Sequence, residues 1–180
     1  AARDMNDLVR TFLILARSGL TDGAEADTIT LGEVAREQAE FWGAAVRCKG
    51  LNFELIDEGT NTAGHNPTFL RTVMANLLRN ALHYTAQGTV RLVLERDGFC
   101  IEDTGMGIPA HEQERIFQPF VRGSAARGEG LGLGLSLVKR ICEHNGWNIS
   151  STSDQETGTC FKVSFTPARA VVCRQAREGR

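Results

Sequence analysis

Three polar side chains share one stripe of a predicted helix. Asn76, Asn80 and His83 lie four and three residues apart, so a helix brings them to one side, with Tyr84 at the edge. Two amides, an imidazole and an aromatic ring could therefore line a single polar cleft. A solvated helix surface has the same pattern, so these residues alone do not decide between the two interpretations.

A carboxylate and two glycines form a second group. Asp103 ends a predicted strand, and Gly105 and Gly107 free the turns that follow it. A carboxylate in this place can accept a hydrogen bond from an exocyclic amine, such as that of adenine, while the glycines let a flat ring approach the backbone. An ordinary Asp-Thr-Gly turn contains the same residues, so the position of the motif in the chain must decide.

A third segment, residues 128–136, is rich in glycine and leads into an apolar helix. Its unobstructed backbone N–H groups, together with the partial positive charge of the helix N-terminus, suit a triphosphate. The segment lacks the Gly-Lys-Ser/Thr ending of a Walker loop, and no predicted strand precedes it as a dinucleotide fingerprint requires. A lid is the competing interpretation, and both can hold together.

The elements that would position these groups follow from hydrophobic periodicity. The pattern predicts a sheet with helices on one face. Asp97-Gly98 is expected to form a hairpin turn, because this dipeptide accepts positive backbone angles. The predicted helices are residues 31–47, 67–84 and 134–144, with a short helical piece at 112–117, and the predicted strands are 28–30, 51–55, 89–96, 99–103, 147–153 and 159–166.

Composition narrows the classes of partner and compartment. The 180 residues include 20 Lys+Arg and 22 Asp+Glu without a long run of one sign, so we expect no nucleic-acid partner and no direct membrane contact. The five cysteines are scattered and show no Cys-x-x-Cys pairing that would suggest zinc or a redox couple, which favours reduced thiols and a cytoplasmic location. No apolar run approaches the roughly twenty residues that span a bilayer.

Five short motifs, in order, resemble the boxes of the catalytic domains of bacterial sensor histidine kinases. Five motifs with these spacings are hard to obtain by chance. The resemblance covers about residues 28–167 and implies an α/β (α+β) two-layer sandwich, in which a mixed, mainly antiparallel sheet of about five strands is backed by three helices. Gyrase-type and chaperone-type ATPases share this fold. The motifs are residues 76–85, 103–109, 117–120, 130–136 and 158–161.

The resemblance also implies roles for the matched residues. Asn80 would ligate Mg²⁺ through its amide oxygen, and Asp103 would bind the adenine amine of ATP. Asn76 stands where the related ATPases carry a water-activating glutamate, and because an asparagine cannot accept a proton, this favours a kinase over a hydrolase. Arg122 and Arg127 complete the expected catalytic set with Asn76 and Asn80, as candidates to neutralise γ-phosphate charge. The expected nucleotide contacts are Asn76, Asn80, His83, Tyr84, Asp103, Gly105, Gly107, Ile108, Gly130, Leu131, Gly132, Leu133, Gly134, Leu135 and Thr159.

The resemblance implies that different residues contact the adenine and the phosphates. Tyr84 would stack near the adenine, Thr159 would support the adenine end, and the glycines of residues 130–134 would cradle phosphate. His83 stands where a lysine or arginine is common. A mostly neutral imidazole would make a weaker phosphate contact, so the role of His83 stays open.

The phosphate acceptor of this family is a histidine of a dimeric helical domain, and no such motif is visible in the sequence. Residues 1–19 resemble the end of the second helix of that domain, and their apolar residues alternate at spacings of three and four. We expect residues 20–27 to be a linker, 28–167 the ATP-binding catalytic domain and 168–180 a C-terminal tail. The parent would be a homodimeric inner-membrane sensor kinase that passes phosphate to a cognate response regulator.

Three alternatives stay open at this point. The first is an ATP-hydrolysing protein of the same fold, against which Asn76 argues. The second is a nucleotide-binding docking module without kinase activity, and the third is a serine-directed kinase of the same fold. The intact Asn80 and Asp103 argue for retained nucleotide binding, and the bundle-like N-terminal helix argues against the third.

Overall fold

Capping residues fix where two of the long helices begin. Helix α2 (Leu31–Cys48) starts with a capping box, in which Thr30 accepts from the Glu33 N–H and the Glu33 carboxylate accepts from the Thr30 N–H. Helix α3 (Pro67–Tyr84) follows Asn66, whose side chain accepts from two N–H groups of the first turn, and proline occupies the first helical position. Local sequence therefore determines both starts.

The computed structural model describes residues 28–59, 62–121 and 132–165. The expected helix remnant at 1–19, the linker at 20–27 and the tail at 168–180 lie outside the described residues. Besides α2 and α3, the described elements are β1 (Ile29–Thr30), β2 (Asn52–Asp57), β3 (Gly64–His65), β4 (Thr89–Glu95), β5 (Gly98–Asp103), α4 (Ala110–Gln113), α5 (Gly134–His144), β6 (Asn148–Asp154) and β7 (Gly158–Ser164).

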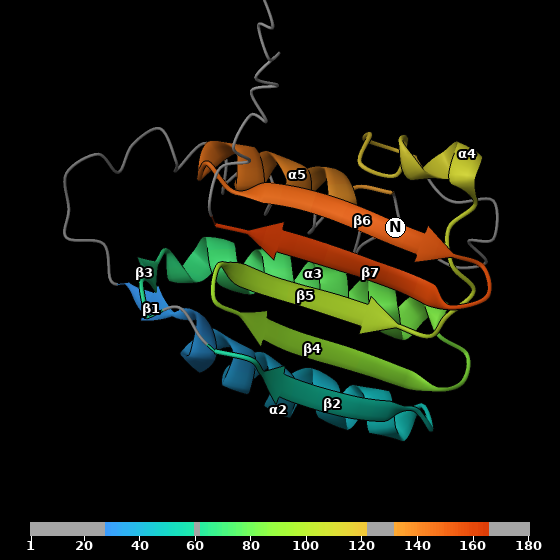
Figure 1. The fold of residues 1–180 in the computed structure, drawn as a ribbon, viewed down its shortest axis with the longest axis horizontal. Helices are drawn as coiled ribbons and strands as arrows, with labels where there is room; N and C mark the ends of the chain where they lie inside the picture. The colour runs from blue at the N-terminus through green and yellow to red at the C-terminus, as the bar shows by residue number, and fades with distance from the viewer. Residues whose placement is uncertain (1–27, 60–61, 122–131, 166–180) are drawn as a thin grey trace, which may run out of the picture.

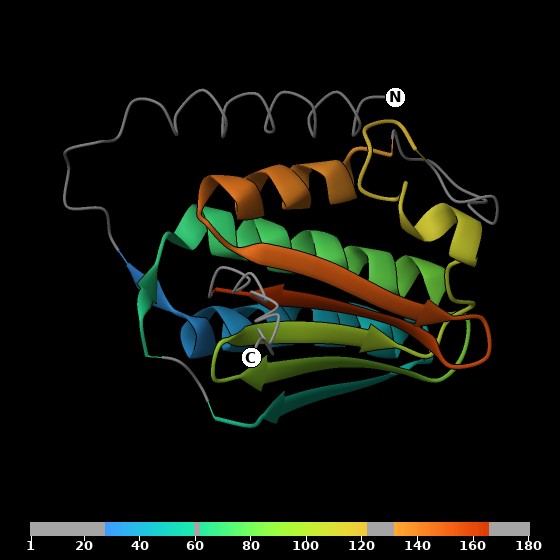
Figure 2. The same ribbon diagram turned by 45° about the horizontal axis from the view of Figure 1, so that its top comes forward.

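Five of the strands form one sheet in the order β2-β4-β5-β7-β6, with β2 and β4 parallel and all other neighbours antiparallel. Helices α2, α3 and α5 cover one face of this sheet, so that Figure 1 looks onto the face that no described helix covers, and Figure 2 shows the two layers more nearly edge-on. The predicted two-layer sandwich with five strands and three helices is confirmed. The two-residue strands β1 and β3 pair separately.

The core lies between α3 and the middle of the sheet. On α3 the fully buried side chains recur with helical period, and on β4 and β5 the fully buried side chains Val90, Leu92, Phe99 and Ile101 stand at alternate positions. Because this packing fixes the apolar side of α3 against the sheet, its polar stripe must face away from the sheet. The buried residues of this core are Leu70, Val73, Met74, Leu77, Leu78, Val90, Leu92, Phe99 and Ile101.

The β4–β5 hairpin differs from its prediction by one residue. Its turn is formed by Arg96 and Asp97, and Gly98 is already in β5, opposite Glu95. Neither turn residue has a positive φ. The glycine serves a different purpose, because a Cβ on Gly98 would lie 1.9 Å from the carbonyl oxygen of Val163 on the neighbouring strand. The predicted Asp97-Gly98 turn was therefore wrong: this glycine permits close strand contact.

Two short elements also differ from their predictions. Helix α4 starts directly after Pro109 and ends earlier than the predicted 112–117 segment. Strand β3 was not among the predicted strands, and in it the ring of His65 contacts those of Trp147 and Phe165 at centroid distances of 5.6 and 4.1 Å. Contacts of this kind join residues distant in sequence, so periodicity does not reveal them.

None of the helices in the described part of the chain combines the length and the apolar character that crossing a bilayer requires.

Candidate functional site

The two asparagines of α3 differ in what their amides contact. The Asn76 Nδ2 donates to the Thr72 carbonyl at 2.8 Å, and its Oδ1 accepts from Arg79 Nη2 at 2.7 Å. Asn80 is half-buried, and within the described part of the chain its amide has no hydrogen-bond partner. One asparagine is therefore held in place, whereas the other offers its amide oxygen to a ligand.

The start of α5 lies against Asn76. A Cβ placed on Gly134 would be 3.1 Å from both Asn76 Oδ1 and Arg79 Nη2, so this glycine allows the helix terminus to approach the asparagine side chain. Helix α5 begins after Leu133 without a side-chain cap, and the Ser136 hydroxyl donates to the Leu133 carbonyl. The first-turn N–H groups of α5 are therefore available to an anion beside Asn76.

Gly132 shapes the turn of the backbone that leads into α5. Its φ is +69°, and a Cβ there would lie 2.6 Å from the carbonyl oxygen of Val121. Its own carbonyl accepts from the Phe120 N–H at 3.2 Å. Both the backbone angle and the close contact require glycine at this position, where the chain turns into α5.

Asp103 lies at the end of β5, next to the C-terminal end of α3. The residue is 6% exposed, and its carboxyl group accepts from the Gly105 N–H at 2.9 Å. The Thr159 backbone and the Thr85 side chain also stabilise its charged form, and the Thr85 hydroxyl itself donates to the Ala81 carbonyl at 2.7 Å. Gly105 contacts α3 directly, since a Cβ there would meet the Tyr84 carbonyl oxygen at 2.6 Å. The carboxylate therefore lies beside the C-terminal end of the asparagine helix.

Burial raises the pKa of Asp103 to about 6, against the opposing effect of the Gly105 N–H, the Thr159 backbone and the Thr85 side chain, which lower it. At neutral pH the group is nevertheless ionised. A carboxylate held charged in a buried position costs free energy, and such costs are concentrated at functional sites.

This raised pKa predicts a specific dependence of stability on pH. Between about pH 4 and pH 6 the folded chain binds a proton at Asp103 that the unfolded chain releases, so the free energy of unfolding should fall as the pH rises through this window, by about 2–3 kcal/mol from this group. Urea unfolding of the wild type and of Asp103→Asn across pH 4–7 isolates this contribution as the difference between the two curves. A difference independent of pH would contradict it.

Two polar residues that the sequence analysis missed hold the turn after Asp103. The Ser153 hydroxyl accepts from the Ile108 N–H at 2.7 Å and lies 2.9 Å from the Thr159 hydroxyl. Gln113 Nε2 donates to the carbonyls of Ile108 and Ser153, each at 2.9 Å. Alternation in a polar strand shows which side Ser153 faces but not its partners, so no sequence signal identified it.

The remaining predicted nucleotide contacts differ in their burial and in their neighbours. His83 is exposed, and its ring meets that of Tyr84 edge-on at a centroid distance of 4.8 Å. Ile108 and Leu135 are partly buried against the core. Gly107 has a φ of +67°, and a Cβ there would lie 2.2 Å from the Asp154 carbonyl oxygen. Arg122, Arg127, Gly130 and Leu131 lie outside the described residues.

Comparison with known proteins gives a family match over residues 65–169, described as histidine kinase-, DNA gyrase B- and HSP90-like ATPase. Among curated proteins, the chain is 35% identical over 178 residues to the sensor protein kinase PilS of Pseudomonas aeruginosa, which covers 93% of this chain and 32% of PilS. The chain spans between 11% and 32% of the length of the first curated relatives that it matches.

Solved structures give a similar result. Full-length ShkA in complex with AMPPNP superposes with a TM-score of 0.71 at 26% identity, over 91% of this chain and 36% of ShkA. The cytoplasmic segment of the histidine kinase QseC superposes with a TM-score of 0.67 at 22% identity, over 93% of this chain and 95% of that segment, a likeness of fold.

Proposed function

The chain belongs to the family of histidine kinase-, DNA gyrase B- and HSP90-like ATPases, as the ATP-binding catalytic domain of a sensor histidine kinase, and we propose that it binds Mg²⁺-ATP and transfers the γ-phosphoryl group to a histidine. The observation that carries the proposal is the convergence of three elements. The uncapped start of α5 lies beside Asn76 on α3, and the turn after the buried carboxylate of Asp103 lies beside Tyr84 at the end of the same helix.

The residues present fit the nucleotide at both ends. Asp103 offers a negatively charged acceptor to the adenine amine, and Tyr84 lies beside the turn that would accept the ring. The first turn of α5 offers N–H groups and a partial positive charge to the phosphates. Asn80 offers a hard amide oxygen, the ligand type that Mg²⁺ prefers when phosphates and waters supply its other ligands. The bound ion would neutralise charge on the phosphoryl oxygens.

Asn76 supports phosphoryl transfer to a protein nucleophile over hydrolysis. Its amide cannot deprotonate water, and both of its polar atoms are engaged, by Thr72 and Arg79. Transfer to a histidine ring needs no such base, because positioning and charge stabilisation supply most of the catalysis in phosphoryl transfer. The role of Asn76 in this proposal is to hold Arg79 and the start of α5 in place.

The proposal extends to a longer protein. Residues 1–19 would end the second helix of a dimerisation domain, 20–27 would link it to the catalytic domain at 28–167, and 168–180 would be a tail. The acceptor histidine would lie in the dimerisation domain of a homodimer, and a response regulator would receive the phosphate next. The parent would be a sensor kinase of the inner membrane with this part in the cytoplasm.

Radiolabelled ATP tests this assignment directly. The chain alone should bind a fluorescent ATP analogue in the presence of Mg²⁺ but acquire no acid-labile label from γ-labelled ATP, because none of its four histidines lies in an acceptor motif. The same chain joined to a helical dimerisation domain with an acceptor histidine should become labelled, and replacing that histidine by glutamine should abolish the label.

Three results would contradict the proposal, each in a different way. Rapid release of phosphate by the chain alone would indicate an ATP hydrolase. Failure to bind the analogue would indicate a docking module without nucleotide. Acid-stable label on serine in the joined protein would indicate a serine-directed kinase.

A further inference from the structure

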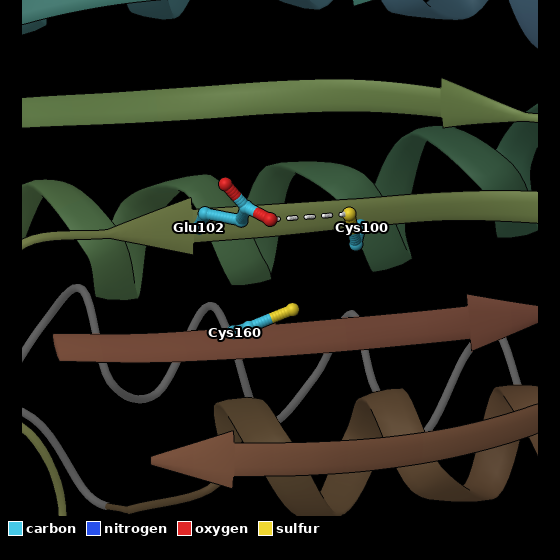
Figure 3. A group of neighbouring side chains, drawn as sticks. All are labelled: Cys100, Glu102 and Cys160. Atoms are coloured by element: carbon cyan, nitrogen blue, oxygen red, sulfur yellow. Dashed lines mark hydrogen bonds between the residues drawn. The ribbon is translucent and has the colours of Figure 1, made fainter. Parts of the chain in front are cut away.

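Two cysteines and a glutamate meet on the sheet face opposite to α3. Cys100 and Glu102 are two residues apart on β5, so strand alternation places both on one side of the sheet, and Cys160 comes from the adjacent strand β7. Glu102 lies directly opposite Cys160 in the strand register. Figure 3 shows the three side chains on this face, with the thiol of Cys160 directed towards the other two.

The spacing of these groups matches that of metal ligands. The two Sγ atoms and a carboxylate oxygen all lie within 4.8 Å of one another, and Cys100 Sγ is 4.0 Å from Glu102 Oε1. A zinc–sulfur bond is about 2.3 Å and a zinc–oxygen bond about 2.0–2.2 Å, so a single ion between the three atoms could bind all of them after a small inward shift.

We infer that Cys100, Glu102 and Cys160 form a binding site for one zinc-type divalent cation. The two thiolates are soft ligands and select zinc over Mg²⁺ or Ca²⁺, and a carboxylate is a common third ligand of zinc. With three protein ligands the fourth tetrahedral position stays open, as it does in zinc sites that accept water or a ligand. A cavity of about 310 Å³, lined in part by Glu102, Thr152 and Cys160, gives this position room.

The surrounding charges orient the glutamate towards the cation. Arg91 Nη1 lies 3.7 Å from Glu102 Oε2, and Arg91 itself is held by Glu54 at 2.7 Å. The other oxygen, Oε1, is the one nearest Cys100. Outer contacts of this kind fix the direction of a metal ligand and add to its affinity. Arg91 also offsets part of the negative charge of two thiolates and a carboxylate.

Sequence spacing does not reveal this site. Cys100 and Cys160 are far apart in the chain and form no Cys-x-x-Cys motif, and only the pairing of β5 with β7 brings them together. The site also lies immediately behind the nucleotide site, because Glu102 precedes Asp103 and Cys160 follows Thr159. A cation here would tie the two strands that carry the adenine end of that site.

Cobalt(II) is the probe for the test, because it enters zinc sites and reports thiolate ligands by its spectrum. The reduced chain, with Cys48 and Cys173 replaced by serine, is titrated with Co²⁺ without oxygen. We expect a thiolate-to-cobalt charge-transfer band and tetrahedral d–d bands that saturate at one ion per chain. Zinc should displace cobalt and abolish both sets of bands.

Single substitutions then identify the ligands. Cys160→Ser and Glu102→Gln should each weaken the affinity for Zn²⁺ at least about tenfold, since losing even an outer-shell partner has effects of this size. Cys142→Ser is the matched control, because Cys142 is a buried free cysteine outside the cluster. The affinity of this variant for zinc should equal that of the chain without the substitution. Thermal unfolding without metal checks that each variant folds.

Several outcomes would overturn the inference. One is the absence of a charge-transfer band in a folded, reduced chain, and another is a band that persists unchanged in Cys160→Ser. A third is a Cys100–Cys160 disulfide found by peptide mapping of the chain as purified, with no metal bound after reduction, which would make the pair a thiol couple. None of these readouts uses ATP, so they are independent of the nucleotide assignment.

Discussion

Asp103→Asn is expected to weaken binding of ATP by about 1–3 kcal/mol, a factor of roughly five to 150 in Kd. The substitution removes the charge that would strengthen the hydrogen bond from the adenine amine, and it can place an amide donor where an acceptor is needed. Titration calorimetry with ATP and Mg²⁺ above pH 7, where Asp103 is ionised, measures the effect. The variant should fold normally, because it no longer buries a charge.

Asp57→Asn is a matched control for this experiment. Asp57 also ends a strand and accepts from the N–H two residues later, that of Gly59, at 3.0 Å, but it is exposed and lies at the opposite end of the sheet, since it pairs with Leu94 of β4 whereas Asp103 pairs with Val90. Its substitution should leave ATP binding unchanged. Inosine triphosphate, which has a carbonyl in place of the amine, should bind the wild type more weakly than ATP and lose that disadvantage in Asp103→Asn. Equal discrimination in both proteins would remove Asp103 from adenine recognition.

Asn80→Ala is expected to abolish the Mg²⁺-dependent part of ATP binding. In a protein that joins the chain to an acceptor histidine, it should slow phosphoryl transfer about 100-fold, because a misplaced phosphoryl group costs this much. Stability should change little, since the half-buried Asn80 amide has no hydrogen-bond partner among the described residues. ATP affinity measured with excess Mg²⁺ and again with a chelator gives the magnesium contribution for each variant.

Two further variants separate metal binding from packing. Asn80→Asp keeps an oxygen ligand and should retain a magnesium contribution, whereas Asn148→Ala makes the same truncation at an exposed position on β6 and should behave as the wild type. If Asn80→Ala retained the full magnesium effect, the ion would have to be held by other residues.

Helix α3 shows what the sequence predicts well. Its proline start, its apolar period and its last residue were all visible, and the structure places it at residues 67–84 as expected. The same holds for α5 and for Asp103 at the end of β5. In each case a strong local signal coincides with the tertiary arrangement, which is why these predictions are reliable.

Contacts between distant segments were not predictable in the same way. That Gly134 lies against Asn76, and that Ser153 holds the turn before Pro109, depends on the order β5-β7-β6 and on the packing of α5 against α3. Gly98 illustrates the limit most clearly. The sequence indicates its turn-forming propensity, but the residue whose close contact requires a glycine is Val163. Val163 is far away in the sequence and lies on β7, the strand that pairs with β5.

The uncapped start of α5 has a consequence for how this helix is encoded. Many helices are preceded by an N-cap serine, threonine, aspartate or asparagine, as α2 and α3 are. In α5 no side chain of the described residues performs that task, and a bound triphosphate would do so instead. The substrate would then act as the N-terminal cap of α5, and the first-turn N–H groups would have all their hydrogen-bond acceptors only while the substrate is bound.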